Sequence, residues 1–422
     1  MNRETPLIAM KNRNILISGA GIAGPTFAYW LKRYGFNPTV VEQAPKPREG
    51  GYLVDFRGVG IDVAELMGIM PKVREKQYFP REMAFVNESN KAIARLDIAR
   101  LFRETFDDPS RAQTQILRSD LVRILYDKTK DEVEYIFGDS IRSMNEGAES
   151  VEVEFESGES KSFDLVVGAD GIHSRVRSLA FGDESQLSHY MGYYQVSFWV
   201  DYPIEAGTNV SFTTPGRFVS LFGFPRHRAM VYAIFKQPQQ FTYDHQDMDT
   251  QKRLFAKAFA HVQWKPMPQL LEQAKTRHDF YFDSANLVQI DEWSKGRMVL
   301  VGDAGYPTPL TAWGVTLALV GSYLLAGELK AAQGDYQVAF EAYEREFRPF
   351  VERKTKEARG TGLQLVPGSA MLLWVRNQVL KLFSLPLLSR LAARMTYGRM
   401  FRESFVLKNY EESKREQEVV PS

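Results

Sequence analysis

The sequence contains no cysteine, which excludes disulfides, thiolate catalysis and cysteine-ligated metals. Its 53 Lys and Arg residues nearly balance its 52 Asp and Glu residues, and the net charge of +1 gives no reason to expect a nucleic-acid partner. No apolar run reaches the length of a membrane span, and the polar stretch 1–14 lacks the apolar core of a signal peptide. We therefore expect a soluble, cytoplasmic protein without a membrane partner.

Length and composition indicate a globular protein of more than one domain. A chain of 422 residues suffices for two domains and a large core, and its hydrophobic share of 44% is ordinary for such proteins. Aromatic residues make up 13% of the chain. We expect most of them in the core and some around a pocket for a flat ligand.

The chain near its N-terminus follows the order strand, glycine turn, helix, strand and acid. These parts occupy, in turn, residues 14–18, 19–24, 23–34 and 38–42, the last ending on Glu42. Gly19 permits the tight turn, Gly21 lets a pyrophosphate approach the backbone, and Gly24 lets the helix lie close to the strand. The helix N-terminus offers free N–H groups to phosphates, and Glu42 has the spacing of an acid that holds a ribose 2′-OH. The complete context favours dinucleotide binding over a purely structural turn.

Two more buried strands run into glycine turns. Residues 165–168 lead into Gly168-Ala169-Asp170-Gly171 and a helix capped by Ser174. Residues 296–301 lead into Gly302-Asp303, a loop and a helix over 315–329. Three such units in one chain favour a parallel sheet that meets a long ligand, although each could be an ordinary strand–loop–helix. His173 beside the second turn receives no role, since a lone histidine is more often structural, and no metal site is expected.

Several charged residues lie where a bound dinucleotide would run. Arg48, Asp55 and Arg57 could contact it or could belong to a solvated loop, and the spacing does not decide between the two. Arg118 follows a strand over 113–117 and precedes a helix for which Ser119 is a plausible N-cap. It could reach a phosphate or a ring edge, or it could be a surface arginine.

The middle of the chain, about residues 188–282, has the alternation of an antiparallel sheet. Period 2 places Phe218, Phe222 and Phe224 on one face, which could line a pocket or pack on helices. A hairpin is predicted before this region, at 79–96.

The C-terminal region is helical. Residues 336–359 predict a polar amphipathic helix that is broken by Gly360 and Gly362. The stretch 371–395 is apolar and basic. A membrane-surface helix is one alternative, and a helix packed over the domains is the preferred interpretation.

The three glycine motifs, taken with Arg118, resemble the aromatic-hydroxylase class of flavin-dependent monooxygenases, the fold of para-hydroxybenzoate hydroxylase. The resemblance covers about residues 12–350. The segments 50–58 and 309–319 and the C-terminal extension are similar to the narrower branch of tetracycline-inactivating flavin monooxygenases, the tetracycline destructases.

This resemblance implies an α/β fold with a discontinuous Rossmann-like FAD-binding domain, an inserted antiparallel-sheet substrate domain and a C-terminal helical extension. The domains are expected at 12–187 with 286–359, at 188–285 and at 360–422. Residues 371–394 are the candidate lid over the substrate site.

The resemblance also implies the residues that bind the cofactors FAD and NADPH. The ADP half of FAD would be held by Gly19, Gly21, Gly24 and Glu42, and its pyrophosphate and ribityl regions by Arg118, Gly302 and Asp303. Asp55 and Arg57 would lie near the flavin, and Pro307 and Gly314 would lie beside its isoalloxazine ring. Arg48 would meet the nicotinamide cofactor, and Asp170 and Gly171 would contact both cofactors. Phe222 and Phe224 are the candidate substrate residues. The polar positions that meet tetracycline elsewhere in the branch have no clear match here.

The implied activity is NADPH- and O2-dependent hydroxylation through a flavin C4a-hydroperoxide, which would inactivate tetracyclines. A substrate that is already an enolate needs no strong general base, so no catalytic acid or base is assigned. Alternatives are a flavin hydroxylase of another phenolic or polyketide substrate and a non-catalytic protein that sequesters flavin or ligand. A small-molecule polyketide or phenolic partner and a monomer are expected.

Overall fold

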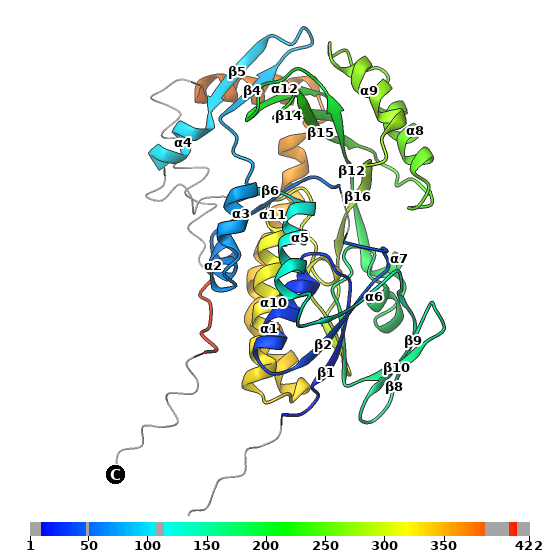
Figure 1. Ribbon diagram of the computed structural model, residues 1–422. Helices are drawn as coiled ribbons and strands as arrows, with labels where there is room; N and C mark the ends of the chain where they lie inside the picture. Colours follow the sequence, from blue (N-terminus) through cyan, green and yellow to red (C-terminus); the bar gives the residue numbers. More distant parts are fainter. Residues whose placement is uncertain (1–9, 48–49, 106–113, 385–404, 412–422) are drawn as a thin grey trace, which may run out of the picture.

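The protein is described by a computed structural model over residues 10–47, 50–105, 114–384 and 405–411. Its central element is a six-stranded sheet (Figure 1). The strands are, in spatial order, β17 (Ser294–Lys295), β18 (Met298–Leu300), β11 (Leu165–Gly168), β1 (Asn14–Ser18), β2 (Asn37–Glu42) and β7 (Glu134–Phe137). All neighbours are parallel except β17 and β18.

The pairing register brings the three predicted turns together. Ser18 of β1 pairs with Gly168 of β11, and Gly168 pairs with Leu300 of β18. Parallel strands in register end at the same edge of a sheet, so the segments that follow β1, β11 and β18 lie side by side there. That edge is where open α/β sheets bind their ligands.

Alternate side chains of β1 enter different layers, as period 2 requires. Ile15 and Ile17 pack in the core formed with the helices, whereas Leu16 packs in the core formed with a small antiparallel sheet. The helices on the first side are α1 (Ala23–Arg33), α2 (Val59–Leu66), α3 (Met70–Lys76), α5 (Arg118–Thr129), α10 (Gly314–Ala331) and α11 (Tyr336–Leu365). On the other side lie β8 (Ile141–Glu146), β9 (Val151–Phe155), β10 (Ser160–Phe163) and α6 (Arg175–Ala180).

A second, seven-stranded sheet forms the other half of the molecule (Figure 1). Its order is β16 (Tyr281–Val288), β12 (Ser188–Asp201), β15 (Arg228–Lys236), β14 (Arg217–Phe224), β13 (Thr208–Thr214), β4 (Glu82–Val86) and β5 (Ala92–Asp97). The predicted hairpin is therefore β4–β5, and it joins the sheet through a parallel pairing of β4 with β13. The helices α8 (Met248–Phe259) and α9 (Met267–Thr276) pack on one face of this sheet, around Phe198 and Phe255.

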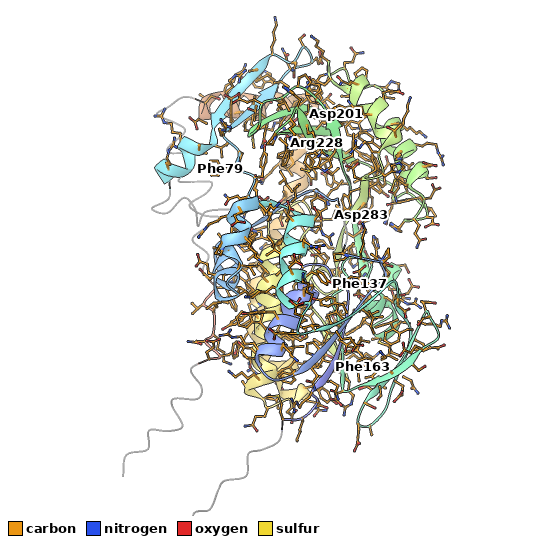
Figure 2. The ribbon with its side chains drawn as sticks, in the orientation of Figure 1. Phe79, Phe137, Phe163, Asp201, Arg228 and Asp283 are labelled. Atoms are coloured by element: carbon orange, nitrogen blue, oxygen red, sulfur yellow. The ribbon has the colours of Figure 1, made fainter. Side chains whose placement is uncertain are left out.

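Other elements complete the described fold. They are β3 (Leu53–Phe56), which pairs with β6 (Thr114–Leu117), α4 (Ile98–Thr105), α7 (Glu184–Leu187), the 3-10 turn η2 (Gly302–Ala304) and α12 (Ala370–Phe383). α12 packs on β5 and β13. Asp283 of β16 lies between the two halves (Figure 2).

The predicted α/β fold class is confirmed, and the exact division into domains stays a prediction. Two local predictions were wrong. Ser119 is not the N-cap of α5, because that helix already begins at Arg118, after Leu117, and no side chain caps it. α11 continues through Gly360 and Gly362, because glycine weakens a helix interior without necessarily ending the helix. A Cβ at 362 would lie 2.5 Å from the ring of Tyr193, so glycine permits close packing there. Within the described ranges, no helix combines the length and apolarity needed to cross a bilayer.

Candidate active site

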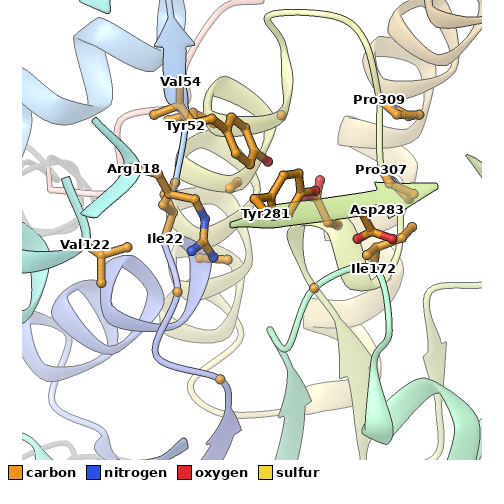
Figure 3. Close-up of a pocket in the computed structure, with 18 of the residues that line it drawn as sticks. Ile22, Tyr52, Val54, Arg118, Val122, Ile172, Tyr281, Asp283, Pro307 and Pro309 are labelled. Carbon is orange, nitrogen blue, oxygen red and sulfur yellow. The ribbon is translucent and has the colours of Figure 1, made fainter. Parts of the chain in front are cut away.

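A cavity of about 440 Å³ runs from the glycine turn after β1 to the inner face of the seven-stranded sheet (Figure 3). Most of the predicted site residues line it. These are Gly19, Gly21, Glu42, Asp55, Arg118, Asp170, Gly171, Phe222, Asp303, Pro307 and Gly314. Residues that are far apart in the sequence therefore meet around one space.

Four predicted residues do not line the cavity. Arg57 is buried, with its guanidinium 5.4 Å from the ring centre of Trp313. Phe224 packs against Tyr78 and Trp199 instead, each ring centre 4.7 Å away. Gly24 and Gly302 shape the turns behind the cavity wall. Arg48 lies outside the described residues.

The turn after β1 has the geometry that its glycines predict. Gly19 has φ +103°, where side chains other than glycine are strained. A Cβ on Gly24 would lie 1.9 Å from the carbonyl oxygen of Gly19, so α1 can approach the turn only without one. A Cβ on Gly21 would meet only the Arg118 guanidinium, at 3.5 Å. The backbone at Gly21 therefore faces open space in the cavity.

The N-terminus of α1 faces this space without a capping side chain. Its N-cap residue, Ile22, makes no side-chain capping hydrogen bond, and its first turn holds no acid. Free N–H groups and the helix dipole favour an anion there. Arg118 lies beside the turn and adds a fixed positive charge (Figure 3).

Glu42 is buried at the carboxyl end of β2. Its two oxygens accept hydrogen bonds from the backbone N–H groups of Ala20 (2.9 Å) and Ala44 (3.0 Å). The carboxylate thus fixes the glycine turn against the second strand. It also lines the cavity, where a carboxylate can accept a hydrogen bond from a ligand hydroxyl.

The two aspartates after β11 and β18 face the same cavity. One oxygen of Asp170 accepts hydrogen bonds from the Ser18 hydroxyl (3.0 Å) and from the N–H of Arg175 (2.9 Å), and its other oxygen is buried with no partner among the described residues. Asp303 extends into the cavity from η2. Burial raises the pKa of each carboxyl above its usual value, and for Asp303 the nearby Arg118 opposes this rise.

A proline-rich loop closes one side of the cavity. Pro307, Thr308, Pro309 and Leu310 line it, and Gly314 begins α10 at its end. Proline offers a rigid apolar surface without an N–H. The loop can therefore pack against a flat ring, while the first turn of α10 presents its N–H groups to an electron-rich edge of that ring.

The opposite wall contains residues that the sequence did not single out. Tyr52 and Tyr281 pack with ring centres 4.7 Å apart, and Tyr232 donates a 2.6 Å hydrogen bond to Gln195. Burial raises the pKa of all three tyrosines, so they stay protonated at neutral pH. The only sequence signal for this wall was polar residues inside apolar strands, such as Gln195 in β12.

His173 belongs to a charged cluster at the edge of the cavity. Its Nδ1 lies 3.0 Å from Glu184, and its Nε2 lies 3.3 Å from Asp283. Burial alone would lower the pKa of His173, but hydrogen bonds to Asp283 and Glu184 outweigh it and raise the pKa to about 10. Sequence reasoning could not predict this cluster, because Asp283 lies 110 residues from His173 along the chain.

Comparisons with known proteins agree with this geometry. The family model described as "FAD binding domain" matches residues 12–358. An uncharacterized protein of Mycobacterium tuberculosis is 38% identical over 351 residues, covering 81% of this chain and 91% of its own. A flavin-dependent monooxygenase of Legionella longbeachae is 37% identical over 349 residues, covering 82% and 88%.

Among solved structures, tetracycline destructase Tet(55) superposes with a TM-score of 0.76 and 31% identity, over 87% of this chain and 95% of that one. The glycine turns, the cavity and the inserted sheet thus occur in a chain that resembles such enzymes along most of its length. The protein belongs to the family of flavin-dependent monooxygenases that share this FAD-binding domain.

Proposed function

We propose that the protein is an FAD- and NADPH-dependent monooxygenase that hydroxylates tetracyclines with O2 and so inactivates them. The observation that carries the proposal is a single cavity that joins the glycine turn to a polar, aromatic wall of the large sheet. The likeness to a tetracycline destructase supports the choice of substrate class.

The residues around the cavity fit FAD. An uncapped helix N-terminus, the open backbone at Gly21 and the charge of Arg118 suit a pyrophosphate. Glu42 and Asp303 offer carboxylate oxygens for ribose and ribityl hydroxyls, and the loop from Pro307 to Gly314 offers a surface for the ring. Bound FAD would supply the redox chemistry, taking electrons from NADPH and delivering one oxygen atom from O2 to an electron-rich carbon.

The protein's own contribution is binding, orientation and exclusion of water. Tyr232 and Gln195 form a hydrogen-bonded pair at the cavity wall, and Phe222 and Met230 add apolar surface beside them. Such a wall can hold a fused-ring substrate that carries several hydroxyls and carbonyls. Because an enolate substrate is already electron-rich, none of these residues needs to act as a strong base.

The test is turnover with a panel of tetracyclines. NADPH oxidation should rise on addition of a tetracycline, and the product mass should increase by one oxygen, about 16 Da. Rapid NADPH oxidation without a mass change would mean that the compound is only an uncoupler. A yellow protein without any stimulated NADPH oxidation would instead indicate flavin or ligand sequestration.

A second candidate is hydroxylation of a different phenolic or polyketide compound. The observation that favours it is the aromatic character of the wall, to which Phe222, Tyr232 and Tyr281 contribute. A screen of phenolic polyketides by NADPH consumption and mass spectrometry separates the two candidates. Oxygen insertion into another scaffold, with none into any tetracycline, would select the second.

A further inference from the structure

The strongest feature outside the proposed cofactor contacts is the cluster around His173. His173 follows the Asp170-Gly171 turn, Asp283 belongs to β16, and His245 lies in the loop before α8. One ring nitrogen of each histidine and one oxygen of Asp283 all lie within 4.8 Å of one another. The rings of His173 and His245 are 4.2 Å apart at their centres. We propose that these three side chains bind one divalent metal ion of the zinc type at the mouth of the cavity.

The distances suit such an ion. Two ligands bonded at about 2.0 Å and at a tetrahedral angle lie about 3.3 Å apart. Nε2 of His173 is 3.3 Å from the carboxylate oxygen of Asp283. Two imidazoles and one carboxylate are a ligand set that zinc accepts in sites that keep an open position for water or another ligand.

Glu184 supports this assignment from outside the ligand set. It contacts Nδ1 of His173 at 3.0 Å, on the ring atom that the ion would not use. Metal-bound histidines usually donate their second N–H to a carboxylate, which fixes the tautomer and orients the ring. Glu184 already occupies the position of such a carboxylate.

The surrounding charges also favour a cation. Burial and the charge of His173 lower the pKa of His245, and the carboxylates of Asp283, Glu184 and Asp244 oppose this decrease. Arg177 adds a positive charge 3.6 Å from Glu184.

An ion bound at this site would contact residues from both halves of the structure. His173 and Glu184 belong to the segment that follows β11 of the parallel sheet, whereas Asp283 belongs to β16 of the large sheet and His245 to the loop before α8. A bound ion would therefore tie the two halves together beside the cavity. It would also order the loop 237–247, which holds His245.

The experiment is equilibrium dialysis of the tag-free, FAD-loaded protein against buffered free Zn²⁺, with bound zinc measured by elemental mass spectrometry. We expect one ion per chain. His173→Ala and His245→Ala should each weaken binding at least about tenfold, and Glu184→Gln should weaken it about 10- to 100-fold. His261→Ala is the matched control, because this exposed histidine lies outside the cluster and should leave binding unchanged.

A second readout does not depend on the variants folding well. Zn²⁺ added to the unaltered protein should slow hydrogen exchange in residues 237–247. The proposal is overturned if His245→Ala binds zinc as the unaltered protein does, if the control weakens binding equally, or if zinc leaves exchange in this loop unchanged.

Discussion

In the first glycine turn, we expect Gly21 to matter for cofactor binding and Gly24 to matter for folding. Gly24→Ala places a methyl group 1.9 Å from the backbone oxygen of Gly19, so α1 must shift by about 1.5 Å to restore an ordinary contact. Gly21→Ala meets only a flexible arginine end at 3.5 Å, and its φ is not in the left-handed region. The same chemical change therefore has different consequences three residues apart.

The two substitutions should therefore differ in their effects on the free energy of unfolding and on the Kd for FAD. Gly24→Ala should lower the free energy of unfolding of the FAD-free protein by about 1–3 kcal/mol, the usual cost of overpacking. Gly21→Ala should leave that free energy unchanged or raise it by about 0.4–1 kcal/mol, because alanine restricts the unfolded chain. The methyl group of alanine at position 21 would instead push a phosphate of FAD away from a backbone N–H. Loss of one charged hydrogen bond costs about 1.5–3 kcal/mol, which is about a 10- to 150-fold rise in the Kd for FAD.

The assay is a pair of measurements on each variant. Denaturant unfolding of FAD-free protein gives the stability, and titration of the same protein with FAD, followed by flavin fluorescence, gives the Kd. If Gly21→Ala binds FAD as tightly as the unaltered protein, the phosphates do not pass over Gly21. Equal loss of stability in both variants would refute this interpretation of the turn geometry.

Three further predictions concern single residues. Asp303→Asn should stabilise the FAD-free protein at neutral pH and weaken FAD binding. The raised pKa of Asp303 means that the ionised carboxylate is disfavoured in the folded state. Wild-type stability therefore falls as pH rises from the ordinary carboxyl pKa to the raised one, and the variant's advantage, measured by unfolding at several pH values, should grow from acidic to neutral pH. Phe222→Ala should raise the KM for the substrate, because Phe222 lines the cavity. Phe224→Ala should leave KM unchanged and lower only the thermal stability, because Phe224 packs against Trp199. Equal KM values for the two variants would contradict the placement of Phe222, but not Phe224, at the cavity wall. Ser174→Ala should cost about 1 kcal/mol in denaturant unfolding, because the Ser174 hydroxyl accepts the N–H of Arg177 at the start of α6, and an unchanged midpoint would argue against that cap.

The cofactor side of the site could be predicted because its signals are local. Each glycine turn is a contiguous stretch in which strand, turn and helix follow one another. Glu42 and Asp303 were found for the same reason, since each ends or follows a buried strand of the parallel sheet. The order of the strands then brings these local units to one edge.

The substrate side could not be predicted because its residues meet only through long-range pairing. Gln195 faces the site because β12 pairs with β16, where it lies opposite Asp283. The packing of Tyr52 on Tyr281 likewise joins a loop of the first segment to the large sheet. Arg57 was expected near the flavin, and its guanidinium lies 5.4 Å from the ring centre of Trp313, a contact that its local sequence does not indicate.

The parallel pairing of β4 with β13 has a consequence for engineering. A chimera that exchanged only residues 188–285 between relatives would set the host's hairpin, 82–97, against a foreign edge strand. Mismatched side chains along that seam would distort the cavity before any substrate contact was tested. Transplanting specificity therefore requires moving the hairpin and the insertion as one unit, although they are far apart in the chain.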